Sequence, residues 1–214
     1  MNIKAVLFDC DGVLVDSEFI YVNSLVDYLK TIGINTTVDE MVCVLGSPVD
    51  AIVEKVRDMF NLYEKMGHEE LLLAQRAFFQ KRFKAAKLEP MPNLVKFLKL
   101  LKSKNIKTAI VSSSNQKYLE DIIKRLNLEG YFDEVIAGES VKYGKPNPDI
   151  YLFAQDRIGL AKEDIVIIED SYNGIKAGKT AGIYTIGYKA SVITQDTSAA
   201  DIEIHDYQEL FDFI

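Results

Sequence analysis

The chain has 214 residues, 48% of them hydrophobic and 27% charged, which is the composition of a globular protein with room for one domain and an insert. Its formal net charge is −7 and no dense cluster of Lys and Arg occurs, which argues against a nucleic-acid partner. No apolar run is long enough to cross a membrane, and the two cysteines, Cys10 and Cys43, indicate neither a disulfide framework nor zinc.

The first predicted element is a strand over residues 5–8, an unbroken apolar run of the kind that is buried on both faces of a parallel sheet. It ends in two aspartates, Asp9 and Asp11, which are followed by Gly12. Ligands of open α/β sheets bind at this carboxyl edge. A polar turn alone would also explain Asp and Gly here, so later segments of the sequence are needed to choose between a turn and a ligand site.

A helical region follows the first strand. Predicted helices run from Ser17 to about residue 32, from residue 36 or 37 to about 46, from Ser47-Pro48 to about 61, and from about 69 to 86. No strand pattern interrupts them. The sequence therefore predicts an all-helical domain over residues 17–88, inserted into a core domain of residues 1–16 and 89–214.

Strands and helices alternate in the rest of the chain. Strands are predicted at residues 107–111, 131–137, 164–168, 183–186 and 202–204, with helices at 93–104, 116–126, 149–158, after Ser171, and at 207–213. This alternation predicts an α/β fold with a doubly wound, mainly parallel sheet.

Three of these strands end in polar clusters. Asp9 and Asp11 follow the first, Ser112 to Ser114 the second, and Glu169 with Asp170 the fourth. Parallel strands place these ends on one edge, where two unit charges about 4 Å apart repel by roughly 4 kcal/mol at an effective dielectric of 20. A proton or a cation must offset this repulsion. Carboxylate-only ligation favours Mg²⁺, whereas the scarcity of histidine and cysteine disfavours zinc.

With a cation at this edge, the serines and Lys145 could bind an anion together. The Ser112 hydroxyl, the backbone N–H of Ser113 and the Lys145 ammonium would form a site for a tetrahedral anion at a helix start. Asp9 is then a candidate nucleophile that forms an aspartyl-phosphate, and Asp11 a candidate acid and base. Ser114 and Asn115 are further candidates for phosphate binding, although a helix cap alone would explain one of these polar residues.

The ordered segments DCDGVLVD, AIVS, KPNPD and IIED resemble the haloacid dehalogenase superfamily, and IEDSYNG resembles its β-phosphoglucomutase-like and sugar-phosphatase subgroup. The resemblance covers the whole chain and implies a catalytic core with a helical cap. It implies that Asp9 is the nucleophile and Asp11 the acid/base, and that Ser112 and Lys145 bind phosphate. It also implies Mg²⁺ ligation by Asp9, the Asp11 carbonyl and Asp170, with Glu169 a ligand or a neighbour of the ligands.

The resemblance implies a Mg²⁺-dependent phosphatase that acts on a small phosphorylated metabolite, such as a sugar phosphate. Two alternatives stay open: a β-phosphoglucomutase-type isomerase, and a binding protein without catalysis. The residues 17–24, SEFIYVNS, lack the histidine that the resemblance leads us to expect in a mutase, which favours hydrolysis. We expect a cytoplasmic protein without a membrane or nucleic-acid partner, as a monomer or possible dimer.

Overall fold

The computed structural model describes residues 2–44, 49–191 and 195–214. The chain forms two compact units. The larger comprises Met1–Asp16 with Leu88–Ile214, and the smaller comprises Ser17–Lys87. The helix start predicted at Ser47-Pro48 lies outside the described residues.

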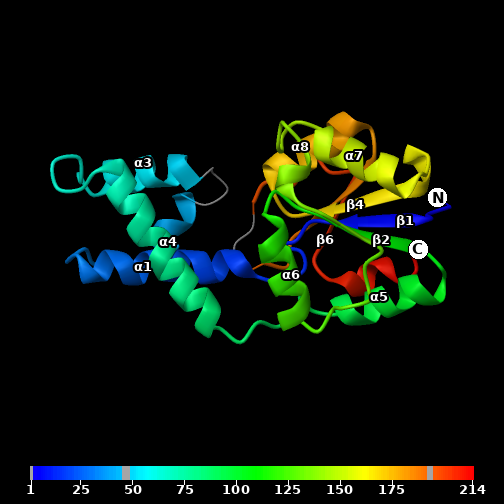
Figure 1. Cartoon of the computed structure of the whole chain (residues 1–214), viewed down its shortest axis with the longest axis horizontal. Helices are drawn as coiled ribbons and strands as arrows, with labels where there is room; N and C mark the ends of the chain where they lie inside the picture. Colours follow the sequence, from blue (N-terminus) through cyan, green and yellow to red (C-terminus); the bar gives the residue numbers. More distant parts are fainter. Residues whose placement is uncertain (1, 45–48, 192–194) are drawn as a thin grey trace. The chain divides into compact units, whose positions relative to one another are not determined.

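The larger unit is built on a six-stranded sheet in which every pair of neighbouring strands is parallel. The strand order is β3-β2-β1-β4-β5-β6. Figure 1 shows β1 between β2 and β4. The strands are β1 (Ala5–Phe8), β2 (Lys107–Val111), β3 (Glu134–Ile136), β4 (Ile165–Glu169), β5 (Tyr184–Tyr188) and β6 (Ile202–Ile204). The chain builds outward from β1 to β3, then returns to β4 on the other side of β1. The predicted fold class is confirmed, and the change of direction between β1 and β4 marks the edge where such folds bind ligands.

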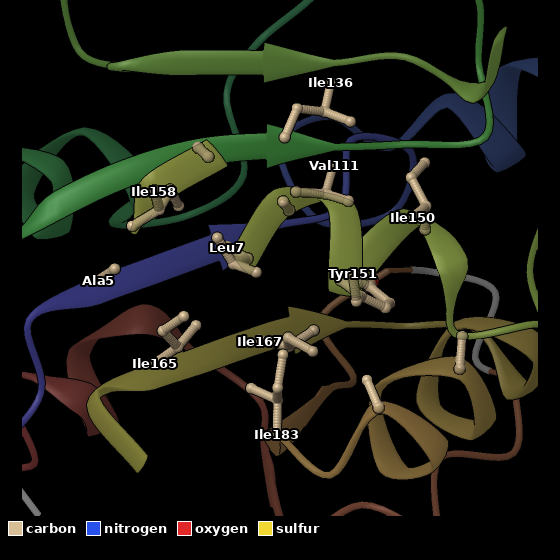
Figure 2. Packing of buried hydrophobic residues seen from close by; sticks show 14 residues of the cluster. Ala5, Leu7, Val111, Ile136, Ile150, Tyr151, Ile158, Ile165, Ile167 and Ile183 are labelled. Carbon is tan, nitrogen blue, oxygen red and sulfur yellow. The ribbon is translucent and has the colours of Figure 1, made fainter. Parts of the chain in front are cut away.

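Helices cover both faces of this sheet. They are α5 (Leu94–Ser103), α6 (Gln116–Arg125), α7 (Asp149–Ile158) and α8 (Tyr172–Ala181). On one face, Leu7 and Ile167 pack with Tyr151 of α7 in a cluster of buried side chains (Figure 2). On the opposite face, the ring of Phe8 lies 6.2 Å from that of Phe97 in α5. Because both faces are covered, the central strands are apolar throughout, which is why they appear in the sequence as unbroken runs.

Two elements are shorter than the sequence predicts. The strand expected over 131–137 is only β3, and the helix expected over 207–213 is a 3₁₀ turn, η4 (Tyr207–Leu210). Before β3, the backbone N–H of Thr108 donates to the Asp133 carboxylate at 2.8 Å, and the Thr108 hydroxyl donates to the Tyr131 carbonyl. Side chains therefore replace part of the strand pairing there.

All the regular secondary structure in the described residues of the smaller unit is helical. It contains α1 (Ser17–Thr31), α2 (Val38–Met41), the 3₁₀ turn η1 (Val42–Val44), α3 (Val49–Met59) and α4 (His68–Ala85). Thr37 caps α2 in a capping box with Glu40. Helices α1 and α4 pack through aromatic rings, with Tyr28 5.2 Å from Phe78. In the described parts of the whole chain, no helix is both long and apolar enough to span a bilayer.

Candidate active site

The site begins in the loop that follows β1. This loop turns back at once, because the Gly12 N–H donates to the Val15 carbonyl at 2.8 Å and the Leu14 N–H to the Cys10 carbonyl at 2.8 Å. Gly12 has a φ of +73°, and a Cβ atom at this position would lie 1.8 Å from a carboxylate oxygen of Asp170. Only glycine therefore allows the loop after β1 to approach the end of β4 this closely.

Three acidic side chains gather at this point. Asp9, Glu169 and Asp170 are 8%, 0% and 5% exposed, and each offers a carboxylate oxygen within 4.8 Å of the others. The side chain of Lys145, which is 5% exposed, lies among them. Its ammonium donates to Asp9 Oδ1 at 2.6 Å, to Glu169 Oε1 at 2.7 Å and to the Val111 carbonyl at 3.0 Å. The ends of β1, β2 and β4 thus meet around one lysine.

Burial and charge shift the ionisation of these groups. Burial, together with the charges of Glu169 and Asp11, raises the pKa of the Asp9 carboxyl to about 7, against the opposing charge of Lys145. Burial alone would lower the pKa of Lys145, but Asp9 and Glu169 outweigh it and hold that pKa well above its usual value. One ammonium therefore does not fully compensate the buried acids. Carboxylate oxygens without nitrogen or sulfur ligands fit a hard cation such as Mg²⁺ in this place.

Glu169 is held by the protein on both carboxylate oxygens. Its Oε1 accepts from Lys145 and, at 3.0 Å, from the Tyr151 hydroxyl, and its Oε2 accepts at 3.0 Å from both the backbone N–H and the hydroxyl of Ser171. Four hydrogen bonds match the lone-pair sites of a carboxylate. Gly174 leaves room for this arrangement, since a Cβ atom there would lie 1.6 Å from Glu169 Oε1. Of the two roles expected for Glu169, these contacts favour steadying the site beside a cation.

The polar residues after β2 are divided between separate tasks. Ser112 is buried, and its Oγ accepts from the Ser114 N–H at 3.1 Å, which leaves the hydroxyl proton unused by that contact. The Ser114 hydroxyl donates to Asp11 Oδ2 at 3.0 Å. Asn115 is the N-cap of α6, because its Oδ1 accepts from the Tyr118 N–H at 2.9 Å. Ser113 is exposed. The helix-cap explanation therefore applies to Asn115.

Two tyrosines in the site do not follow from the sequence analysis. Tyr118 donates its hydroxyl to Asp11 Oδ1 at 2.6 Å, and Tyr151 donates to Glu169. Each is the third residue of a helix that follows a loop carrying predicted site residues. Their place in the first turn of such a helix is the signal that the sequence offers, but it does not fix the direction in which the side chain points.

A family model described as haloacid dehalogenase-like hydrolase matches residues 6–188. The chain belongs to this family. It is 34% identical over 189 residues to a phosphorylated carbohydrates phosphatase of Thermotoga maritima. The matched region covers 86% of this chain and 83% of that protein. It is 32% identical over 183 residues to a phosphoglycolate phosphatase of Aquifex aeolicus, covering 85% and 83%.

A solved structure supports the same family assignment. The crystal structure of a predicted β-phosphoglucomutase from Thermotoga maritima superimposes with a TM-score of 0.82 at 30% identity, over 99% of this chain and 98% of the other. The family expected from the four sequence segments is therefore confirmed, and with it the expectation that the chain is a hydrolase.

Proposed function

We propose that this chain is a Mg²⁺-dependent phosphatase that hydrolyses a small phosphorylated metabolite, with a sugar phosphate as the preferred class, through an aspartyl-phosphate on Asp9. The observation that carries the proposal is the Lys145 ammonium, buried between Asp9 and Glu169 at the edge where Asp170 also lies. The named relatives, phosphatases of phosphorylated carbohydrates and of phosphoglycolate, support the substrate class.

Asp9 and Asp170, with the backbone carbonyl of Asp11, are the groups that would hold Mg²⁺, with Glu169 beside them. When bound, the cation offsets the charge of the acids and of the phosphoryl oxygens. The phosphoryl group would also accept hydrogen bonds from the Ser112 hydroxyl and the Ser113 N–H at the start of α6, where the helix terminus favours an anion.

The chain's own residues account for two steps. In the first, an Asp9 oxygen attacks phosphorus, the bond to the leaving oxygen breaks, and Asp11 gives that oxygen a proton. In the second, Asp11 takes a proton from a water molecule that attacks the same phosphorus, so that phosphate leaves and the Asp9 carboxylate is restored. Lys145 holds Asp9 by one oxygen throughout, which directs the other toward the substrate.

The test is phosphate release from a panel of sugar phosphates by the purified protein with Mg²⁺. We expect release that EDTA abolishes and that Mg²⁺ restores, and we expect no release from Asp9→Asn, whose amide is a poor nucleophile. Lys142→Met, on the exposed part of the loop before Lys145, is the matched control and should retain activity. Full activity of Asp9→Asn, or activity unaffected by EDTA, would overturn the proposal.

The same panel separates the alternatives. An isomerase would convert β-glucose 1-phosphate to glucose 6-phosphate in the presence of a bisphosphate primer, with little free phosphate. A binding protein would retain a phosphorylated ligand without turnover. Either result would replace hydrolysis as the activity of this site.

A further inference from the structure

The side chain of Asp11 is held by two hydroxyl groups that come from one short segment. Tyr118 donates to its Oδ1 at 2.6 Å, and Ser114 donates to its Oδ2 at 3.0 Å. The first distance lies at the short end of the range for O–H···O hydrogen bonds. With one donor on each oxygen, the plane of the carboxylate is fixed as well as its position.

Tyr118 lies in the first turn of α6, which is capped and packed on the core. Its backbone N–H is capped by Asn115, and the following residues Leu119 and Ile122 bury the inner face of α6 in the core. The Ser114 N–H is bonded in turn to the buried Ser112 hydroxyl. The backbone of both donor residues is thus held by hydrogen bonds. Between the Tyr118 backbone and its ring there are only two rotatable bonds.

We propose that Tyr118 is a positioning residue for the acid/base group, a role that rests on the proposed function of the site. By holding Asp11 Oδ1, Tyr118 keeps the carboxyl group oriented for proton transfer at the leaving oxygen while Asp9 attacks phosphorus. Without the phenolic hydroxyl, Asp11 Oδ1 loses the shorter of the two hydroxyl hydrogen bonds, and the carboxyl group is held less firmly against rotation about its Cβ–Cγ bond. Small errors of placement weaken proton transfer severely, because it requires hydrogen-bond distance to the leaving oxygen.

The experiment compares Tyr118→Phe with the wild-type protein on two phosphate monoesters. An alkyl phosphate has a basic leaving oxygen that needs a proton, whereas p-nitrophenyl phosphate has a leaving group that departs without one. For both esters kcat/KM reports the steps up to phosphoryl transfer. We expect kcat/KM to fall about tenfold or more for the alkyl ester and less than about threefold for the aryl ester, with the alkyl KM nearly unchanged.

Two further variants sharpen the result. Ser114→Ala removes the other hydroxyl on Asp11 and should shift the alkyl-to-aryl ratio in the same direction. Tyr131→Phe removes a phenolic hydroxyl from a tyrosine whose ring lies beside Lys102 and should leave turnover of both esters unaffected. The Tyr131 backbone contacts Thr108 near the start of β2, whereas the acids lie at the ends of the strands. Circular dichroism and thermal unfolding establish that each variant is folded.

The outcomes separate this inference from the proposed function. If Tyr118→Phe lowers both esters equally, or neither, then Tyr118 does not position the proton donor and the inference is wrong, while the phosphatase assignment stands. If the wild-type protein releases phosphate from neither these esters nor the sugar phosphates, both the assignment and the inference fall together.

Discussion

Replacing Lys145 by Met tests how the buried acids are held in the fold. The ammonium donates to Asp9 Oδ1 at 2.6 Å and to Glu169 Oε1 at 2.7 Å, and its side chain is only 5% exposed. Met fills a similar volume and carries no charge. The variant therefore leaves two buried carboxylates, Asp9 and Glu169, without the ammonium that both contact.

The expected loss of stability is large. Removing one partner of a buried ion pair costs about 3–5 kcal/mol, because the remaining charge is buried and uncompensated. Here the value belongs to the larger unit alone, so the measurement must report on that unit. Native-state hydrogen exchange of the amides in β1 and β4 does so, and the loss corresponds to roughly a 10²- to 10⁴-fold drop in their protection.

The assay is run in EDTA, so that no divalent cation takes the place of the ammonium. Lys142→Met, an exposed change of the same charge in the same loop, should leave protection within about threefold. Added Mg²⁺ should restore part of the protection in Lys145→Met, because the cation supplies positive charge to the same acids. A drop of less than tenfold in EDTA would show that the acids do not depend on Lys145, and the electrostatic reasoning would then be wrong.

Two other predictions concern a close contact and a titration. Gly174→Ala should destabilise the larger unit by about 1–3 kcal/mol in thermal unfolding, because the new Cβ would lie 1.6 Å from Glu169 Oε1. Gly144→Ala is the control, because it lies in the same unit and nothing lies within 4 Å of its Cβ position. A loss no greater than that of the control would contradict this packing. In the smaller unit, a hydrogen bond to Glu54 raises the pKa of His68, so NMR titration should place it above the ordinary value. Because the pKa of His68 is higher in the folded than in the unfolded protein, this group stabilises the fold at pH values below its unfolded pKa. The stabilisation is lost as the pH rises through its folded pKa. Glu54→Gln should bring the His68 pKa down.

Much of the fold could be predicted because its signals are local. The strand predicted over residues 107–111 is β2 with the same bounds, and its end is marked by the change from the apolar run 109–111 to three serines. The region before β3 was harder, because Thr108 takes up the Tyr131 carbonyl through its side chain, a contact between residues distant in sequence. The final 3₁₀ turn begins with a capping box at Asp206, which resembles the start of any helix, so the sequence predicts its beginning better than its length.

The candidate site could likewise be predicted only in part. The meeting of Asp9 and Asp170 could be predicted, because parallel strands bring their carboxyl ends to one edge whatever the side-chain details. The contacts of Tyr118 and Tyr151 could not, because a tyrosine in a first helical turn can face the core, the solvent or the loop. Only packing decides among these, and it is not encoded in local spacing.

The central claim is that Asp9 carries the phosphoryl group, and acid quenching during turnover of a radiolabelled aryl phosphate tests it most directly. We expect label bound covalently to the wild-type protein, released by hydroxylamine, and absent from Asp9→Asn. Asp11→Asn should accumulate more label, because the aryl group departs without a proton while hydrolysis of the aspartyl-phosphate lacks its base. Turnover without bound label, or label retained by Asp9→Asn, would contradict the account.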